Sequence, residues 1–186
     1  MKPILFNTEM VRAILEGRKT VTRRILKPQP TDCLIYEEMG KYYCSDFVER
    51  HEIKPPCRPG DILYVRETWA QPAKHMFRYR ADSPVQNLLW QPSIHMPKAA
   101  ARIFLRVTEV RAERLKEICG RGLVDEGLFS FDELRNGMMR EKFSAFKNLW
   151  DSTIKPADLN IYGWDADPLV WVIEFERISK EAAQCD

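Results

Sequence analysis

Short runs of alternating apolar and polar residues predict most of the secondary structure of this chain. The clearest run is 101–110, where Ile103, Leu105 and Val107 alternate with arginine and phenylalanine residues, as in a strand with one buried face. Similar runs predict strands at 3–6, 20–26, 62–67, 75–80 and 169–177. These strands do not alternate with helices, so the pattern disfavours a doubly wound parallel sheet.

Apolar residues at helical spacing predict two helices. The first follows Asn7 or Thr8, either of which can cap an N-terminus, and ends at Gly17, which tolerates positive φ. The second covers 131–150, and short helical turns precede it within 115–127. The sequence therefore predicts an α+β fold, a small mixed β-barrel with helices packed at its mouth and side.

Two loop-rich stretches interrupt this pattern. Residues from about 28 to 58 contain a Met39-Gly40-Lys41 turn between aromatic residues, which predicts a small hairpin, and residues 81–97 contain three prolines. We interpret both as insertions in a single domain, residues 1–178, which a polar tail at 179–186 follows. The sequence does not predict the oligomeric state.

Composition narrows the functional classes. The 186 residues carry a formal net charge of only +2, so contact with nucleic acid requires a local basic patch. The apolar runs are too short for a signal peptide or a membrane span, and the odd number of cysteines without close pairs disfavours a disulfide framework. We expect a cytoplasmic protein without a membrane partner.

The sequence contains one set of residues that could form a metal site. Four residues can in principle collect zinc: Cys33, Cys44, His51 and Cys57. Their spacing lacks the close ligand pairs that structural zinc sites usually show, so we predict neither a metal nor a cofactor.

Cationic and hydroxyl side chains gather where the first predicted helix meets the next strand. The residues concerned are Arg18, Lys19, Thr22, Arg23 and Arg24. Lys19 and Thr22 are three positions apart, so a turn can bring both to one side. The alternative interpretation is a solvated basic helix end that complements the helix dipole.

The spacing Gly17, Lys19, Thr22 and Arg24 after a short N-terminal helix resembles the ASCH domain family, relatives of the PUA RNA-binding fold. Three later stretches, 59–69, 92–97 and 168–175, fit the longer, phage- and prophage-borne branch of that family. The resemblance implies a PUA-like barrel and RNA or a modified nucleoside as the partner.

The resemblance also implies a catalytic set. In ASCH members similar to the small acetylcytidine amidohydrolases, a lysine, a threonine and a glutamate carry the hydrolysis. Lys19 and Thr22 match the first two, and Glu126 is the match for the third, with Glu117 as the alternative. Those hydrolases are much shorter than this chain, and both insertions lie between Thr22 and Glu126. Some ASCH members are also linked to RNA cleavage.

The same basic residues suit a non-catalytic module that binds RNA or modified nucleic acid, which is the alternative function. In that module Arg18, Arg23 and Arg24 contact phosphates. Three residues at the end of the 62–67 strand are further candidates for binding: Arg66, Glu67 and Trp69. Trp69 is either a core residue or a stacking plate for a base. A structural protein of a phage particle is a third class, without specific support.

Overall fold

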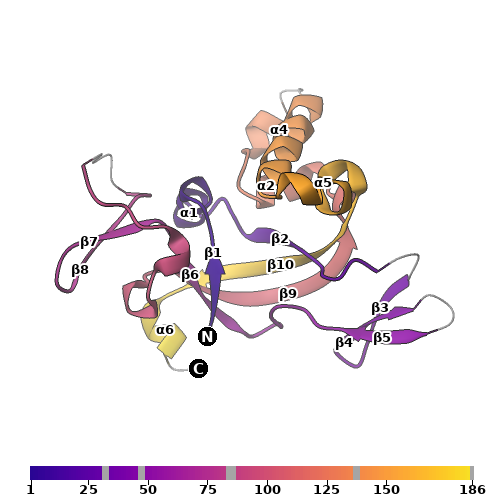
Figure 1. Ribbon diagram of the computed structural model, residues 1–186, viewed down its shortest axis with the longest axis horizontal. Helices are drawn as coiled ribbons and strands as arrows, with labels where there is room; N and C mark the ends of the chain where they lie inside the picture. Colours follow the sequence, from indigo (N-terminus) through magenta and orange to yellow (C-terminus); the bar gives the residue numbers. More distant parts are fainter. Residues whose placement is uncertain (31–33, 46–48, 83–86, 136–138, 185–186) are drawn as a thin grey trace.

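The computed structural model describes residues 1–30, 34–45, 49–82, 87–135 and 139–184. Its centre is a five-stranded sheet in the order β1-β6-β9-β10-β2 (Figure 1). The strands are β1 (Lys2–Leu5), β6 (Ile62–Arg66), β9 (Phe104–Arg114), β10 (Leu169–Ile178) and β2 (Val21–Ile25). β1 pairs parallel to β6 and the other neighbours are antiparallel, so the predicted α+β class is confirmed.

The long pair β9 and β10 forms the middle of the molecule because it is apolar on both faces. One face joins Trp171, Ile173 and Phe175 to the largest core cluster, and the other joins Val170 and Val172 to a second cluster beneath the later helices. Helices α2 (Gly120–Asp125), α3 (Phe131–Arg135), α4 (Met139–Ser152) and α5 (Leu159–Tyr162) follow β9 in the chain. The described parts of the predicted 131–150 helix are thus two helices, α3 and α4.

The first helix, α1 (Thr8–Leu15), has the predicted ends. The Met10 amide donates a hydrogen bond of 2.8 Å to the Asn7 side chain, and Gly17 adopts a φ of +75° just after the helix. Val11 and Ile14 are fully buried against the main sheet. This helix connects the two edge strands, β1 and β2.

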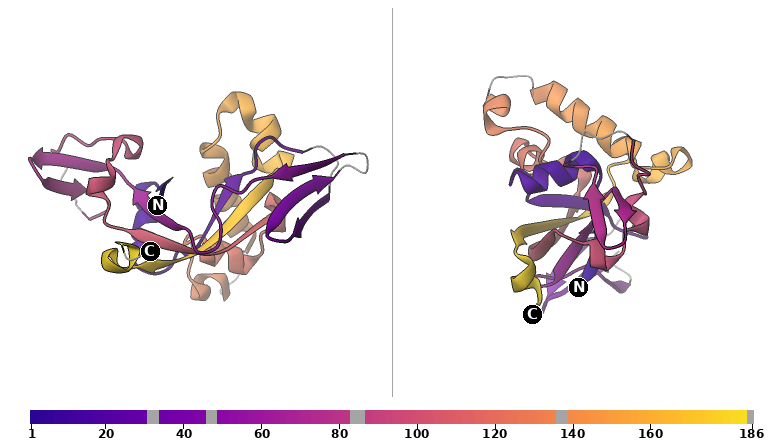
Figure 2. Two further views of the ribbon diagram at one scale, coloured as in Figure 1. Left: turned by 90° about the horizontal axis from the view of Figure 1, so that it is seen from below. Right: turned by 90° about the vertical axis from the view of Figure 1, so that its left-hand side faces the viewer.

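Two small sheets project from opposite ends of the molecule (Figure 2). The first insertion carries β3 (Leu34–Glu38), β4 (Lys41–Ser45) and β5 (Arg50–Ile53), with the predicted turn at Met39 and Gly40. The Tyr42 hydroxyl donates to the Val110 carbonyl and so anchors this sheet to β9. The other small sheet pairs β7 (Trp69–Ala73), which was not predicted, with β8 (Met76–Tyr79).

Two details differ from the sequence analysis, the end of the chain and the state of one cysteine. Residues 180–184 of the predicted polar tail form helix α6 (Lys180–Gln184), because Ala183 packs into a third core cluster. Cys44 is disulfide-bonded, whereas Cys57 and Cys119 are free. Among the described residues, none of the helices is long and apolar enough to cross a membrane.

The predicted closed barrel is absent from the described residues. β1 and β2 are the two ends of the main sheet, and no ladder joins them. A side chain spans the gap instead, since the Arg24 guanidinium donates a hydrogen bond of 2.9 Å to the Leu5 carbonyl. The sheet therefore stays open on the side where a barrel would close.

Candidate functional site

Lys19 and Glu126 form a buried ion pair between the end of α1 and the end of α2. The Lys19 ammonium lies 2.5 Å from Glu126 Oε2, and the two side chains are 0% and 6% exposed. The same ammonium donates to the carbonyls of Val21 and Glu126, at 2.7 and 3.0 Å. It thus has one acceptor for each of its three hydrogens.

Backbone contacts bring these two segments together. Lys19 and Glu126 form an isolated antiparallel bridge, and the Thr20 amide donates to the Asp125 carbonyl at 2.9 Å. Gly127 permits this approach: it adopts a φ of +79°, and a Cβ there would lie only 2.8 Å from the Cβ atoms of Lys19 and Ala13. The pairing of Lys19 with Glu126 therefore depends on a glycine at 127.

Gly127→Ala should lower the free energy of unfolding by about 1–3 kcal/mol, since it combines an unfavourable φ with a steric clash. Gly60→Ala is the matched control, because Gly60 also has a positive φ but no atom within 4 Å of the added Cβ. Urea unfolding should show a larger loss at 127 than at 60. Equal losses would mean that the contact with Lys19 adds nothing.

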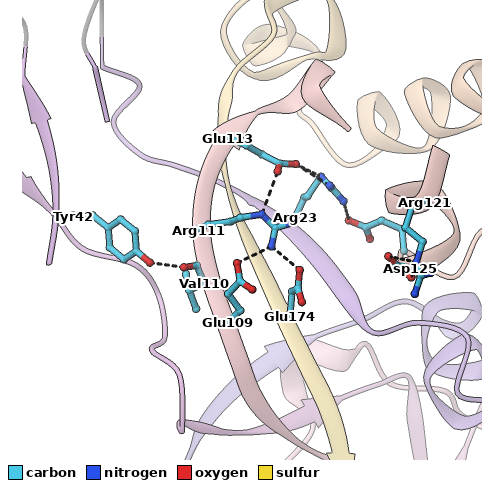
Figure 3. A network of polar contacts seen from close by, with 10 residues as sticks. Arg23, Tyr42, Glu109, Val110, Arg111, Glu113, Arg121, Asp125 and Glu174 are labelled. Carbon is cyan, nitrogen blue, oxygen red and sulfur yellow. Dashed lines mark hydrogen bonds and ion pairs between the residues drawn. The ribbon is translucent and has the colours of Figure 1, made fainter. Parts of the chain in front are cut away.

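Arg23 extends the pair into a network that reaches the surface (Figure 3). Its guanidinium contacts Glu126 Oε1 at 3.1 Å and Glu113 Oε1 at 2.8 Å. Glu113 in turn lies 3.5 Å from Arg111, which pairs with Glu174 at 2.5 Å. Charges thus alternate along the whole chain of contacts, and two carboxylates neutralise Arg23.

Burial and neighbouring charges have opposite effects on the pKa values of Lys19 and Glu126. Burial lowers the pKa of Lys19, and the carboxylate of Glu126 raises it again in part. Burial alone would raise the pKa of Glu126, but the charges of Lys19 and Arg23 prevail, so the pKa lies below the ordinary glutamate value. Glu126 is therefore an ionised carboxylate at neutral pH.

Glu126 also faces a cavity of about 250 Å³. Thr22, Arg23 and Arg24 of β2 line the cavity together with Glu126, and α4 supplies aromatic walls through Phe146 and Trp150. Lys19 is not in the lining and reaches the cavity only through Glu126. Of the predicted catalytic residues, Thr22 and Glu126 thus share this cavity with Arg24, and Lys19 lies behind Glu126.

Other candidates lie outside this cavity. The Arg18 side chain pairs with Glu16 and donates to the Gly127 carbonyl at the surface. The Glu117 carboxylate accepts a hydrogen bond from the Arg114 amide and so caps a short 3-10 turn, which separates it from Lys19. Glu126 is therefore the carboxylate that meets Lys19.

The three candidates near the end of β6 are also separate from the cavity. Glu67 is buried and pairs with Arg102 at 2.9 Å; burial raises its pKa although Arg102 opposes this. Arg66 donates to the Ile94 carbonyl. Trp69 is 5% exposed and packs in the third core cluster, so it is a core residue rather than a stacking plate.

Sequence analysis missed Glu113. Glu113 lies on β9 and Arg23 on β2, and β10 runs between these two strands. Val172 of β10 pairs with Arg23 on one side and with Arg111, two residues before Glu113, on the other. The only signal of Glu113 in the sequence was an acidic residue between the basic residues Arg111 and Arg114. The described residues contain no cluster of three metal-ligating side chains, and Cys33 of the considered zinc set lies outside them.

Comparisons with known proteins give little guidance. No protein-family model matches the chain, and no curated protein is similar to it. One solved structure is similar, that of protein EF3133 from Enterococcus faecalis V583, described with the family model DUF984. It shares 12% identity, the match covers 96% of this chain and 82% of that one, and the TM-score is 0.39. A TM-score this low does not establish a common fold.

Proposed function

We propose that this chain is an ASCH-type amide hydrolase that removes an acyl group from a modified nucleoside such as an N-acylated cytidine. One observation carries the proposal. Glu126 joins the buried ammonium of Lys19 on one side and a cavity that also contains Thr22 on the other. A hydroxyl and a carboxylate therefore line one cavity, and a buried ammonium holds the carboxylate from outside it, which are the groups that a threonine nucleophile needs.

In this proposal each group has one role. Thr22 Oγ1 attacks the acyl carbon, and its proton passes to the carboxylate of Glu126, which faces the cavity. Lys19 and Arg23 hold that carboxylate in place and balance its charge. As the acyl carbon–nitrogen bond breaks, Glu126 returns the proton to the leaving amine. Water then hydrolyses the acyl-threonine ester by the same proton route, which restores Thr22.

Arg24 adds a positive charge to the proposed catalytic residues. It lines the same cavity, and among the described residues its hydrogen bonds go to main-chain carbonyls rather than to carboxylates. Burial lowers its pKa, but a guanidinium stays protonated at neutral pH. Its charge is thus available to the oxygen that becomes negative when the acyl carbon turns tetrahedral.

The substrate class can be tested directly. The wild-type protein should release free acid from N-acylated cytidines in a panel of acylated nucleosides and short acylated RNAs, measured by mass spectrometry of the products. The unacylated nucleosides are the control. If no member of the panel is hydrolysed, the catalytic proposal fails.

The alternative is a module that binds RNA or modified nucleic acid without catalysis, and the guanidinium of Arg24, whose hydrogen bonds go to carbonyls, favours it. Affinity for single-stranded RNA should then fall steeply with salt, because contacts with phosphates release counterions. An affinity that does not change in a salt titration would exclude phosphate contacts.

A further inference from the structure

A second, larger cavity of about 480 Å³ lies in the open side of the main sheet. Its walls are the two edge strands, with Lys2–Leu5 of β1 on one side and Arg24 and Ile25 of β2 on the other. The strands between supply an apolar floor made by Leu63, Trp171 and Ile173. The cavity therefore occupies the place where a closing ladder would bring β1 and β2 together.

The lining of this cavity is positively charged. It includes Arg24, Lys27 and Lys54, and no described aspartate or glutamate lines it. Cys57, also in the wall, adds no negative charge at neutral pH, because burial raises the pKa of its thiol to about 11. Lys2 differs from the other cations, since its ammonium pairs with Asp61 at 3.0 Å.

The three remaining cations form no side-chain ion pair within the described part of the chain, although Arg24 feels the charge of Glu126. The Arg24 guanidinium bonds to the carbonyls of Arg23 and Leu5, and it lies 5.2 Å from the centre of the Phe6 ring. The Lys27 ammonium lies 4.6 Å from the centre of the Tyr162 ring. Lys54 forms no ion pair among the described residues. These positive charges around an apolar floor favour the binding of an anion in the cavity.

We propose that this cavity binds an organic anion with a flat apolar body, whose phosphate or carboxylate faces Arg24, Lys27 and Lys54. The apolar body would cover Trp171 and its neighbours, and the charged group would accept hydrogen bonds from the rim. The volume suits one ligand of nucleotide size. Thr22 and Glu126 line the other cavity, and the two cavities share the wall at Arg24 and Ile25, so an anion bound here would use the same Arg24 charge as the proposed hydrolysis.

Calorimetric titration with two pairs of probes tests the role of the charge. Adenosine 5′-monophosphate is compared with adenosine, and 2-naphthoate with 2-naphthol. We expect at least one anion to bind at least about tenfold more tightly than its neutral partner. This ratio corresponds to the free energy of one hydrogen bond to a charged group. Preference for the nucleotide identifies a phosphate ligand, and preference for the naphthoate a carboxylate. If neither anion binds more tightly than its partner, the proposal is wrong.

A matched pair of variants tests the location. Lys27→Ala/Lys54→Ala should weaken binding of the preferred anion about tenfold or more, and both residues are exposed, so the fold should tolerate the change. Arg58→Ala/Lys74→Ala removes the same charge from exposed positions outside the cavity and should leave the affinity within about twofold. Equal affinities in the two double variants would mean that the anion binds elsewhere and would overturn the site.

Discussion

Glu126→Ala should lower the free energy of unfolding by about 3–5 kcal/mol, because it leaves the ammonium of Lys19 buried without a counter-charge. The Lys19 side chain is fully buried, and the two acceptors that remain to its ammonium, the carbonyls of Val21 and residue 126, carry no net charge. Arg23 would keep only Glu113 as its partner. Urea unfolding followed by tryptophan fluorescence measures the change.

The double variant Lys19→Met/Glu126→Leu is the control for this prediction. It removes both charges and keeps most of the buried volume, so its loss should be clearly smaller than that of Glu126→Ala. Arg23 can keep its contact with Glu113 in both variants. A double variant as unstable as the single one would show that shape, rather than the unpaired ammonium, determines the cost.

Thr22→Val should abolish hydrolysis of an acylated nucleoside while the protein stays folded. Valine fills the same space in the strand but has no hydroxyl, so the loss should reach at least the factor of about 10²–10⁴ typical of one catalytic group. Thr22→Ser keeps a hydroxyl and should retain measurable turnover. Steady-state rates on the preferred substrate, with melting temperatures of each variant, provide the measurement.

The threonine nucleophile has a specific alternative. If Thr22→Val retains full activity, water must be the nucleophile, and Glu126 would activate it directly. Trapping separates the two routes, since only a threonine nucleophile forms an acyl-enzyme that mass spectrometry can detect. Loss of activity together with a large drop in melting temperature would instead indicate a structural role for the hydroxyl.

Local patterns in the sequence predicted local structure well. Alternation identified β9 and β10, and the capping residue Asn7 and the terminal Gly17 delimited α1, because these features depend on neighbours in the chain. Strand β7 was missed, since Gln71-Pro72 disguises it as a loop. The open side of the sheet was also missed, because alternation shows which face of a strand is buried but not how many partners it has.

The candidate site was predictable to a similar extent. The motif resemblance selected Lys19 and Glu126, and the structure brings these two into contact. The link from Glu126 through Arg23 to Glu113 could not be read from the sequence, because it depends on the register of three strands. The residue type alone could not distinguish a core tryptophan from a base-stacking one at Trp69, whose ring packs against Phe77.

The gap between β1 and β2 affects how the protein resists aggregation. An open sheet normally offers its edge strands to other molecules, which can add a strand and start an assembly. Here both edges border one cavity, and Arg24 connects them through its bond to the Leu5 carbonyl. The start of β2 is further occupied by the bridge between Lys19 and Glu126. A second molecule would have to displace these contacts first, so the arrangement protects the edges much as a closed barrel would.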